Sequence, residues 1–350
     1  MWSSTKTYFR LLAEDRERGL VAKGLYLLLG FLSFFYQGVV GLLRDFHEKK
    51  VLKRHRLPFP VISVGNLTWG GAGKTPLVEY LARRVSEQHL TPLILSRGYS
   101  HDEVDQLRYH LPRAVLGVGK NRVEIAESIG KTQPIHVAVL DDGLQHWRLE
   151  RDIEIIVVNV LNPFGNGRLI PRGILREPLS VLKKASIVVL NHVNLVKPEE
   201  VTELKNKIQS IAPNAFVAES YLEPLFFYRA DRHKRVSLDR LQNQRVTTFS
   251  AVGMPRSFQL LLSRCQIKTS RNFEFTDHHP FTEKELEEIK EVSKSAAVDD
   301  IITTEKDFYR SPDSITRILN PLVLATRLRI LSGEEVLMDR LLRLLGVRQG

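Results

Sequence analysis

The sequence predicts an α/β protein with a mostly parallel sheet flanked by helices, joined by a β-ribbon linker to a second, smaller α/β domain. Short runs rich in Val and Ile alternate with helical or loop segments, which is typical of a parallel sheet covered on both faces. A glycine-rich stretch separates the first of these runs from an amphipathic segment, which indicates a strand, a loop and a helix. Near residue 220 the pattern changes to longer alternating segments around a polar stretch.

The elements of the larger domain follow from these runs in order. Residues 58–64, PFPVISV, predict a buried strand, and the periodic residues 76–87 predict the helix after the glycine-rich stretch. Four further apolar runs predict the remaining buried strands, at residues 92–95, 136–140, 153–158 and 187–190.

The smaller domain is expected to follow the alternating segments at residues 217–252. Its predicted helices begin at Ser257 and Thr282, and its predicted strands lie near residues 271–275, 300–304 and 321–325. The predicted divisions are an N-terminal membrane-associated segment at 1–45, a larger domain at 46–220, and the linker with the smaller domain at 221–350.

The charge and composition restrict the partners. The 350 residues carry 51 Lys and Arg against 40 Asp and Glu, a net charge of +11, so we expect the surface to attract anions. The single cysteine, Cys265, excludes an internal disulfide and a multi-cysteine metal site, which fits a reducing compartment. No RNA-binding signature or zinc-finger spacing is present, so we expect no nucleic-acid partner, and no obligate protein partner is evident.

An uncharged run of 20 residues, 24–43, lies near the N-terminus. As a helix it would be about 30 Å long, the hydrocarbon thickness of a bilayer. Three alternatives remain open: a helix lying on an anionic membrane surface, a single membrane span, or a core helix. The first is favoured by the basic residues on both sides of the run: Arg16, Arg18, Lys23, Arg44, Lys49, Lys50, Lys53, Arg54 and Arg56.

The glycine-rich stretch is a variant phosphate-binding loop, or P-loop. Glycines before a helix let backbone N–H groups surround phosphate oxygens, the loop lysine neutralises β/γ oxygens, and the following hydroxyl binds Mg²⁺. Thr68 stands where the usual pattern has its first glycine. The predicted nucleotide-binding residues are Thr68, Gly70, Gly71, Ala72, Gly73, Lys74 and Thr75, and the loop predicts a P-loop NTPase-like fold.

Acidic residues that fit a magnesium site follow another predicted strand. Asp141 and Asp142 come directly after the buried run 136–140, as in a Walker B strand, although a solvated pair in a turn is the alternative. Arg176 and Glu177 are a second candidate pair, with Arg176 binding phosphate and Glu177 completing the metal shell. A surface ion pair is the alternative there.

Six segments occur together in the order seen in tetraacyldisaccharide 4′-kinases, the lipid A enzymes that this chain resembles over residues 20–330. They are VGNLTWGGAGKTP, LSRGY, VLDDGLQH, PFGNGRLIPRGILREP, TDHHPFT and TTEKD. The resemblance implies ATP, Mg²⁺ and phosphorylation of the 4′-hydroxyl of a tetraacyldisaccharide 1-phosphate. It also implies work at the cytoplasmic face of the inner membrane of a Gram-negative-type bacterium.

The resemblance also implies the catalytic residues. The family has a longer insertion after SRGY, ending in Gly-Asp-Glu-Pro; this chain lacks it, and Asp102 with Glu103 align best with its Asp-Glu. Asp102 is therefore the predicted base for the sugar hydroxyl, and His278 is predicted to hold and polarise Asp102 from the second domain when the enzyme closes. Lys74 is the third catalytic candidate.

Two other function classes remain open on the sequence. A P-loop GTPase or ATPase acting as a switch or motor at the membrane surface would carry the same loop and aspartates. A GTPase would usually also show Asn-Lys-x-Asp, which neither residues 191–194 nor residues 304–307 match. A membrane-surface scaffold would leave the loop unexplained.

Overall fold

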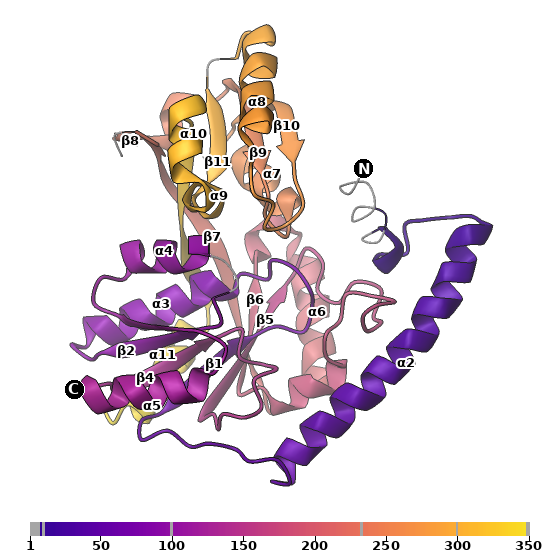
Figure 1. Cartoon of the computed structure of the whole chain (residues 1–350), viewed down its shortest axis with the longest axis vertical. Coiled ribbons are helices and arrows are strands. Elements are labelled where there is room, and N and C mark those ends of the chain that lie inside the picture. The colour runs from indigo at the N-terminus through magenta and orange to yellow at the C-terminus, as the bar shows by residue number, and fades with distance from the viewer. Residues whose placement is uncertain (1–7, 9–10, 99–100, 232–233, 299, 348–350) are drawn as a thin grey trace. The chain divides into compact units, whose positions relative to one another are not determined.

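The computed structural model describes residues 8, 11–98, 101–231, 234–298 and 300–347, and the chain forms two compact units (Figure 1). The first unit comprises residues 1–97, 111–221 and 330–350, and the second comprises residues 98–110 and 222–329.

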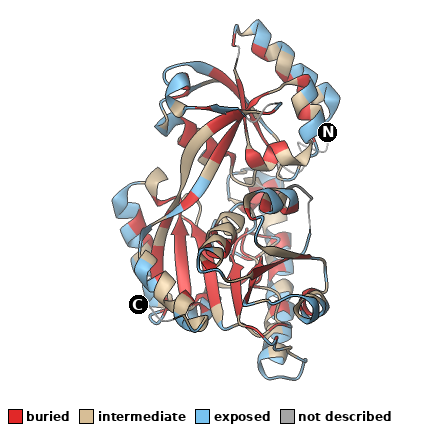
Figure 2. Cartoon of the chain, turned by 90° about the vertical axis from the view of Figure 1, so that its left-hand side faces the viewer, coloured by how far each residue is buried: buried red, intermediate tan, exposed pale blue. Residues whose placement is uncertain are grey.

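A parallel sheet forms the centre of the first unit, with the strand order β7-β6-β5-β1-β4-β2-β3. Three of these strands are buried along their whole length and two more at all but one residue, which explains why they appear in the sequence as continuous apolar runs (Figure 2). Their bounds are β1 (Val61–Gly65), β2 (Pro92–Ser96), β3 (Val115–Val118), β4 (Val137–Asp141), β5 (Ile153–Asn159), β6 (Ile187–Asn191) and β7 (Phe216–Arg229).

Helix α3 packs against this sheet through an apolar stripe. In α3 the buried residues Leu77, Val78, Leu81, Ala82 and Val85 recur at helical spacing. The helices of the unit are α2 (Leu20–Glu48), α3 (Lys74–Glu87), α5 (Arg122–Thr132), α6 (Pro198–Ile211) and α11 (Glu334–Leu344), with short 3₁₀ turns η1 (Leu179–Lys184) and η2 (Val193–Leu195). The predicted α/β fold class is confirmed.

In the second unit β10, β9, β11 and β12 pair in parallel, and β12 is followed by β7 in the same continuous sheet. Separate apolar clusters pack around Phe249 and around Leu262. The further elements are α4 (His101–His110), β8 (Arg235–Val236), η3 (Leu238–Leu241), β9 (Arg245–Ser250), α7 (Pro255–Arg264), β10 (Lys268–Glu274), α8 (Glu283–Ser295), β11 (Ile301–Thr304), α9 (Glu305–Arg310), α10 (Pro312–Ile318) and β12 (Leu322–Ser332).

The predicted divisions differ from these units in three places. Residues 98–110 group with the second unit because α4 packs on α9. Residues 330–350 return to the first unit, where the hydroxyl of Tyr80 donates a 2.6 Å hydrogen bond to Glu334 of α11. Residues 1–45 also group with the first unit rather than standing apart. All three differences arise from contacts between residues far apart in the sequence. Hydrophobic periodicity does not predict such contacts.

Candidate active site

The phosphate-binding loop lies between β1 and α3, at the carboxyl end of the sheet. Gly70 and Gly73 have φ angles of 107° and 89°, in the left-handed region that favours glycine. A Cβ on Gly73 would also lie 2.0 Å from the side-chain nitrogen of Asn191. Gly73 is the N-cap residue of α3 and makes no side-chain cap bond, so the helix N-terminus is open to an anion.

Two asparagines at neighbouring strand ends hold the loop in shape. Asn159 and Asn191 are register partners at the ends of β5 and β6. The Asn159 amide donates to the carbonyl of Gly71, and the Asn191 amide donates to the carbonyl of Ala72, both at 3.1 Å. Among the described residues, the loop bonds use carbonyl oxygens and leave the N–H groups of residues 70–73 unengaged, as a phosphate cradle requires.

The other side of the loop is tied to the segment that carries Arg176. Thr68 is buried and forms an isolated antiparallel bridge with Leu175. The N–H of Trp69 donates to the carbonyl of Ile174, and the N–H of Arg176 donates to the carbonyl of Leu67, both at 2.7 Å. Thr68 therefore serves as a strand-like edge of the loop, which is how a β-branched residue replaces the usual glycine.

Two predicted phosphate ligands converge on Asp142. The Arg176 guanidinium donates two hydrogen bonds to this carboxylate, at 2.7 and 3.0 Å, and the Lys74 ammonium lies 3.3 Å from it. Burial favours the protonated form of Asp142, but the hydrogen bonds from Arg176 and the charge of Lys74 hold its pKa well below the usual range. Asn66, fully buried, accepts from Lys74 at 2.9 Å and also from Arg176.

Of the predicted metal ligands, Thr75 and Asp141 lie in contact with each other. The Thr75 hydroxyl donates to Asp141 at 3.3 Å, which pairs two oxygens at the start of α3 and the end of β4. Among the described residues, no group of three His, Cys, Asp or Glu side chains assembles around a common point. Magnesium needs only one or two carboxylates, because substrate phosphates and water complete its shell.

Glu177 is buried completely and faces the N-terminal helix rather than solvent. Its carboxylate lies 3.4 Å from the Arg44 guanidinium of α2. Burial raises the pKa of Glu177 to about 7, against the lowering effect of Arg44 and Arg176. The exposed ion pair that was the alternative for Arg176 and Glu177 is therefore excluded: each has a separate, partly or fully buried partner.

One polar face of α2 contacts the segment 169–177. The Ser33 hydroxyl donates to the carbonyl of Leu169 and accepts from the N–H of Arg172, both at 2.9 Å. The Tyr36 hydroxyl donates to the carbonyl of Arg176 at 3.0 Å. This helix therefore contacts the backbone of a predicted phosphate ligand directly, and Figure 1 shows it running along the outside of the unit.

The opposite face of α2 is apolar and exposed. Among the described residues it is the one helix long and apolar enough to cross a membrane, and 6% of its apolar window is buried. That exposure does not fit a core helix, so the surface-lying and spanning alternatives remain. The exposed apolar residues are Leu20, Val21, Leu27, Leu28, Phe31, Leu32, Phe34, Phe35, Val39, Leu42, Leu43 and Phe46.

The two predicted acid–base residues lie in the second unit. Asp102 stands in the first turn of α4, and its side chain lies outside the described part of the structure. His278, in the turn after β10, has a left-handed φ of 59° and a half-exposed side chain. The sequence predicted that these two residues lie in different domains and meet when the domains close. In the structure they belong to the same unit, because α4 packs on α9.

Comparison with known proteins decides the family. The chain matches the model of the family described as tetraacyldisaccharide-1-P 4′-kinase over residues 25–104 and 100–346. The chain belongs to this family of kinases. It is 35% identical over 339 residues to the probable mitochondrial tetraacyldisaccharide 4′-kinase of Arabidopsis thaliana, with 86% of each covered. The Halothermothrix orenii enzyme is 32% identical, with 91% of this chain and 92% of that one covered.

A solved structure agrees with this kinase assignment. The crystal structure of the Aquifex aeolicus LpxK protein in complex with ATP is 26% identical, with a TM-score of 0.69. The alignment covers 92% of this chain and 99% of that one.

Several residues of this kinase's site were not singled out from the sequence. Asn159 and Asn191 follow buried strands, and a polar residue at the carboxyl end of a parallel strand is a usable signal. Asn66 directly follows β1 and gives the same signal. Tyr36 and Arg44 lie inside or beside the apolar run, where the sequence offers no sign that they contact the active-site segment.

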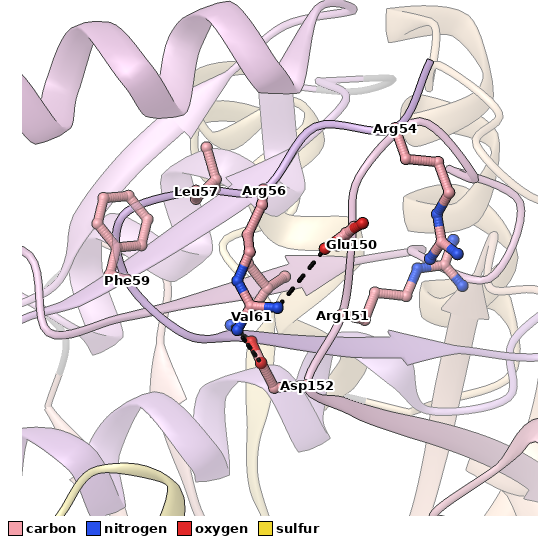
Figure 3. A pocket seen from close by; sticks show the side chains of 8 residues that line it. All are labelled: Arg54, Arg56, Leu57, Phe59, Val61, Glu150, Arg151 and Asp152. Atoms are coloured by element: carbon pink, nitrogen blue, oxygen red, sulfur yellow. Dashed lines mark hydrogen bonds and ion pairs between the residues drawn. The ribbon is translucent and has the colours of Figure 1, made fainter. Parts of the chain in front are cut away.

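A separate pocket of about 260 Å³ lies at the amino ends of β1 and β5, away from the carboxyl ends where the kinase P-loop begins (Figure 3). Arg56 lies 3.6 Å from Glu150 and 3.5 Å from Asp152 there, and Asp152 accepts a 2.8 Å bond from the N–H of Val61. These ion pairs join the basic linker to the sheet.

Proposed function

We propose that this kinase transfers the γ-phosphate of ATP to the 4′-hydroxyl of tetraacyldisaccharide 1-phosphate at the cytoplasmic face of the inner membrane. The open N-terminus of α3, with Lys74 and Arg176 converging beside it, is the observation that carries the proposal. A helix N-terminus with two adjacent cations is suited to a polyphosphate.

Asp142 acts as a placeholder for phosphate in this arrangement. Its carboxylate receives Lys74 and both guanidinium nitrogens of Arg176, which are the donors that a γ-phosphate needs. Phosphate oxygens would therefore compete with Asp142 for the same cations. Because Asn66 stays bonded to Lys74, the lysine remains oriented toward the loop during that exchange.

Thr75 and Asp141 are the residues that would hold Mg²⁺. Their oxygen pair, 3.3 Å apart at the start of α3, fits a hard cation that keeps several waters. When bound there, the metal would reduce the negative charge that repels a nucleophile. Asp142 lies within reach of that shell as the next residue, whereas Glu177 is engaged with Arg44 and acts on the site through its neighbour Arg176.

Asp102 and His278 serve the acceptor. A sugar hydroxyl is a poor nucleophile, so transfer benefits from a carboxylate that orients it and accepts its proton as the new P–O bond forms and the bond to the β-phosphate oxygen breaks. ADP leaves with the electron pair of the broken bond. His278 orients and polarises Asp102.

The exposed apolar face of α2 places the enzyme at its substrate. Acyl chains remain in the bilayer, so an active site that works on their headgroup must lie at the membrane surface. Exposed Phe31, Phe34 and Phe35 fit burial at the boundary of headgroups and acyl chains, and the flanking basic residues fit anionic lipid.

The test is transfer of labelled γ-phosphate from ATP to tetraacyldisaccharide 1-phosphate in detergent micelles. Wild type should form labelled lipid. Lys74→Ala should lose about 10²–10³-fold in rate because it removes a charge that stabilises the transferred group. Asp102→Ala should lose about 10²–10⁴-fold while ATP affinity is kept.

Nucleotide hydrolysis by wild type without labelled lipid would contradict the kinase and favour a P-loop switch or motor. Near-normal transfer by Asp102→Ala would remove Asp102 from the mechanism and leave the kinase in place.

A further inference from the structure

The segment Thr304-Glu305-Lys306-Asp307 joins the end of β11 to the start of α9 in the second unit. Thr304 caps the helix by accepting a 3.2 Å bond from the N–H of Asp307. The Asp307 side chain is fully buried and accepts a 3.1 Å bond from the N–H of Ala251, at the end of β9. The start of α9 is therefore fixed to the sheet on both sides of Lys306.

The same helix fastens the turn that carries His278. The guanidinium of Arg310 donates to the carbonyls of Ala251 and His279, at 3.3 and 3.4 Å. The N–H of His278 donates to the carbonyl of Ala251 at 3.2 Å. Since Asp307 bonds the N–H of Ala251, one short segment at the end of β9 connects α9 to the backbone of His278.

Lys306 points into the space between that turn and α4. Its ammonium nitrogen lies 3.0 Å from the carboxylate of Glu103, 3.5 Å from Asp277, and 3.5 Å from Nε2 of His278. The side chain is 25% exposed, so solvent screens these contacts only in part. Glu103 directly follows Asp102, so one lysine contacts the neighbours of both predicted acid–base residues.

Electrostatics keep this lysine charged. Burial disfavours the ammonium form, but the carboxylates of Glu103 and Asp277 outweigh that effect and raise the pKa of Lys306 above its ordinary value. An ammonium group can only donate hydrogen bonds. Lys306 is therefore the donor in its contact with Nε2 of His278.

A purely structural anchor between α4 and α9 already exists one residue earlier. His110, at the end of α4, lies 3.3 Å from the carboxylate of Glu305. The two helices are thus joined without Lys306, whereas Lys306 alone of this segment reaches His278 among the described contacts. Lys306 therefore contacts His278 as well as joining α9 to α4.

We propose that Lys306 is a positioning residue for phosphoryl transfer. It holds His278 and the first turn of α4 against one another, so that His278 and Asp102 act on the sugar hydroxyl as one unit. The inference rests on the proposed roles of those two residues.

The experiment is a double-mutant cycle with Lys306→Met and His278→Ala, followed by kcat for lipid phosphorylation and the Kd for ATP. Lys306→Met should lower kcat about 10–10²-fold, because small misplacement of catalytic groups has effects of that size. ATP affinity should not change. In the His278→Ala background, Lys306→Met should change kcat by no more than about twofold, since it would have no histidine left to position.

Three further variants keep the result interpretable. Lys294→Met removes an exposed lysine that pairs with Glu291 at 3.1 Å, and it should leave kcat unchanged. Lys306→Arg retains the charge and should keep more activity than Lys306→Met. If thermal unfolding shows that Lys306→Met does not fold, Lys306→Gln takes its place in the cycle.

An equal loss of kcat from Lys306→Met in the wild-type and His278→Ala backgrounds would overturn the role of Lys306 and leave the proposed function in place. Such a result is expected of a purely structural residue, whose effect does not depend on the histidine. Wild-type turnover of His278→Ala would instead overturn the proposed role of His278, and the inference with it.

Discussion

Two turns from strand to helix each place a lysine at the start of a helix, and they are built in opposite ways. Between β1 and α3 the chain makes a glycine-rich loop, Lys74 is the first residue of the helix, and the N-cap residue Gly73 offers no side-chain bond. Between β11 and α9 there is no loop, Lys306 is the second residue, and the Thr304 hydroxyl closes the helix end.

The difference separates a binding turn from a positioning turn. An open helix N-terminus retains N–H groups and positive potential for an anion, whereas a hydroxyl cap uses them internally. The first lysine has one carboxylate, Asp142, which it shares with Arg176, while the second stands between Glu103 and Asp277. Damage to the first turn should therefore weaken ATP binding, and damage to the second should slow transfer.

The strongest expected effect concerns Gly73→Ala. Its φ of 89° strains any L side chain, and the new Cβ would lie 2.0 Å from the Asn191 amide that supports the loop. Distortion of about 1–3 kcal/mol should weaken ATP affinity by about 10–10²-fold in a calorimetric titration. Gly167→Ala is the matched control, because Gly167 also has a left-handed φ, 72°, but has open space around it. Equal loss of affinity in both variants would contradict the steric argument.

Acid should destabilise the protein through His192, which directly follows the loop-supporting Asn191. Burial lowers the pKa of His192 to about 4, and the N–H of His192 donates a 2.9 Å bond to Asn191. Between pH 6.5 and 4, His192 is protonated in the unfolded chain but stays neutral in the folded chain. The free energy of unfolding therefore falls as the pH falls. The loss is about 2 kcal/mol at pH 5.

His192→Asn keeps a residue type that tolerates the left-handed φ of 68° and removes the titrating ring. Chemical unfolding of this variant should show a smaller stability difference between pH 7.5 and pH 5 than wild type shows. If His192→Asn shows the same stability difference between the two pH values as wild type, groups other than His192 cause the acid sensitivity.

The smallest effect is expected from the cap of the positioning turn. Thr304→Ala should lower the free energy of unfolding by about 1 kcal/mol, as should Thr282→Ala, which removes the equivalent cap from α8. Thr304→Ala alone should also lower kcat, because it loosens the start of the helix that carries Lys306. A loss of ATP affinity in Thr304→Ala would contradict the claim that the second turn affects transfer and not ATP binding.

The sequence predicted the parts of this molecule that depend on local patterns. Fully buried strands such as β4 and β6 are continuous apolar runs, and their bounds were predicted to within one residue. The glycine-rich loop before α3 was also predicted, and two of its glycines, Gly70 and Gly73, adopt the left-handed φ that favours this residue. Short β3 was not predicted, because two of its four residues are only half-buried and one is exposed.

The unpredicted parts depend on contacts between distant segments. Nothing local places α4 with α9, since the pairing rests on Lys306 with Glu103 and His110 with Glu305. The contact of Arg44 with Glu177 likewise joins residues 133 positions apart. Sequence patterns indicate which residues carry chemistry, but the partners that orient them come from the fold.

The contacts of α2 hold the segment 169–177 at a fixed place along this helix. Three residues, Ser33, Tyr36 and Arg44, fasten it, and the first and last are 11 positions apart, or about 16 Å of helix rise. A helix held at both ends of such a length cannot slide past the segment it contacts. The position of α2 along its own axis therefore fixes the position of the Arg176 backbone, whose carbonyl accepts from Tyr36. A shift of α2 by one helical turn, about 5.4 Å along its axis, would therefore carry the segment 169–177 with it and would draw Arg176 away from Asp142, to which it donates two hydrogen bonds.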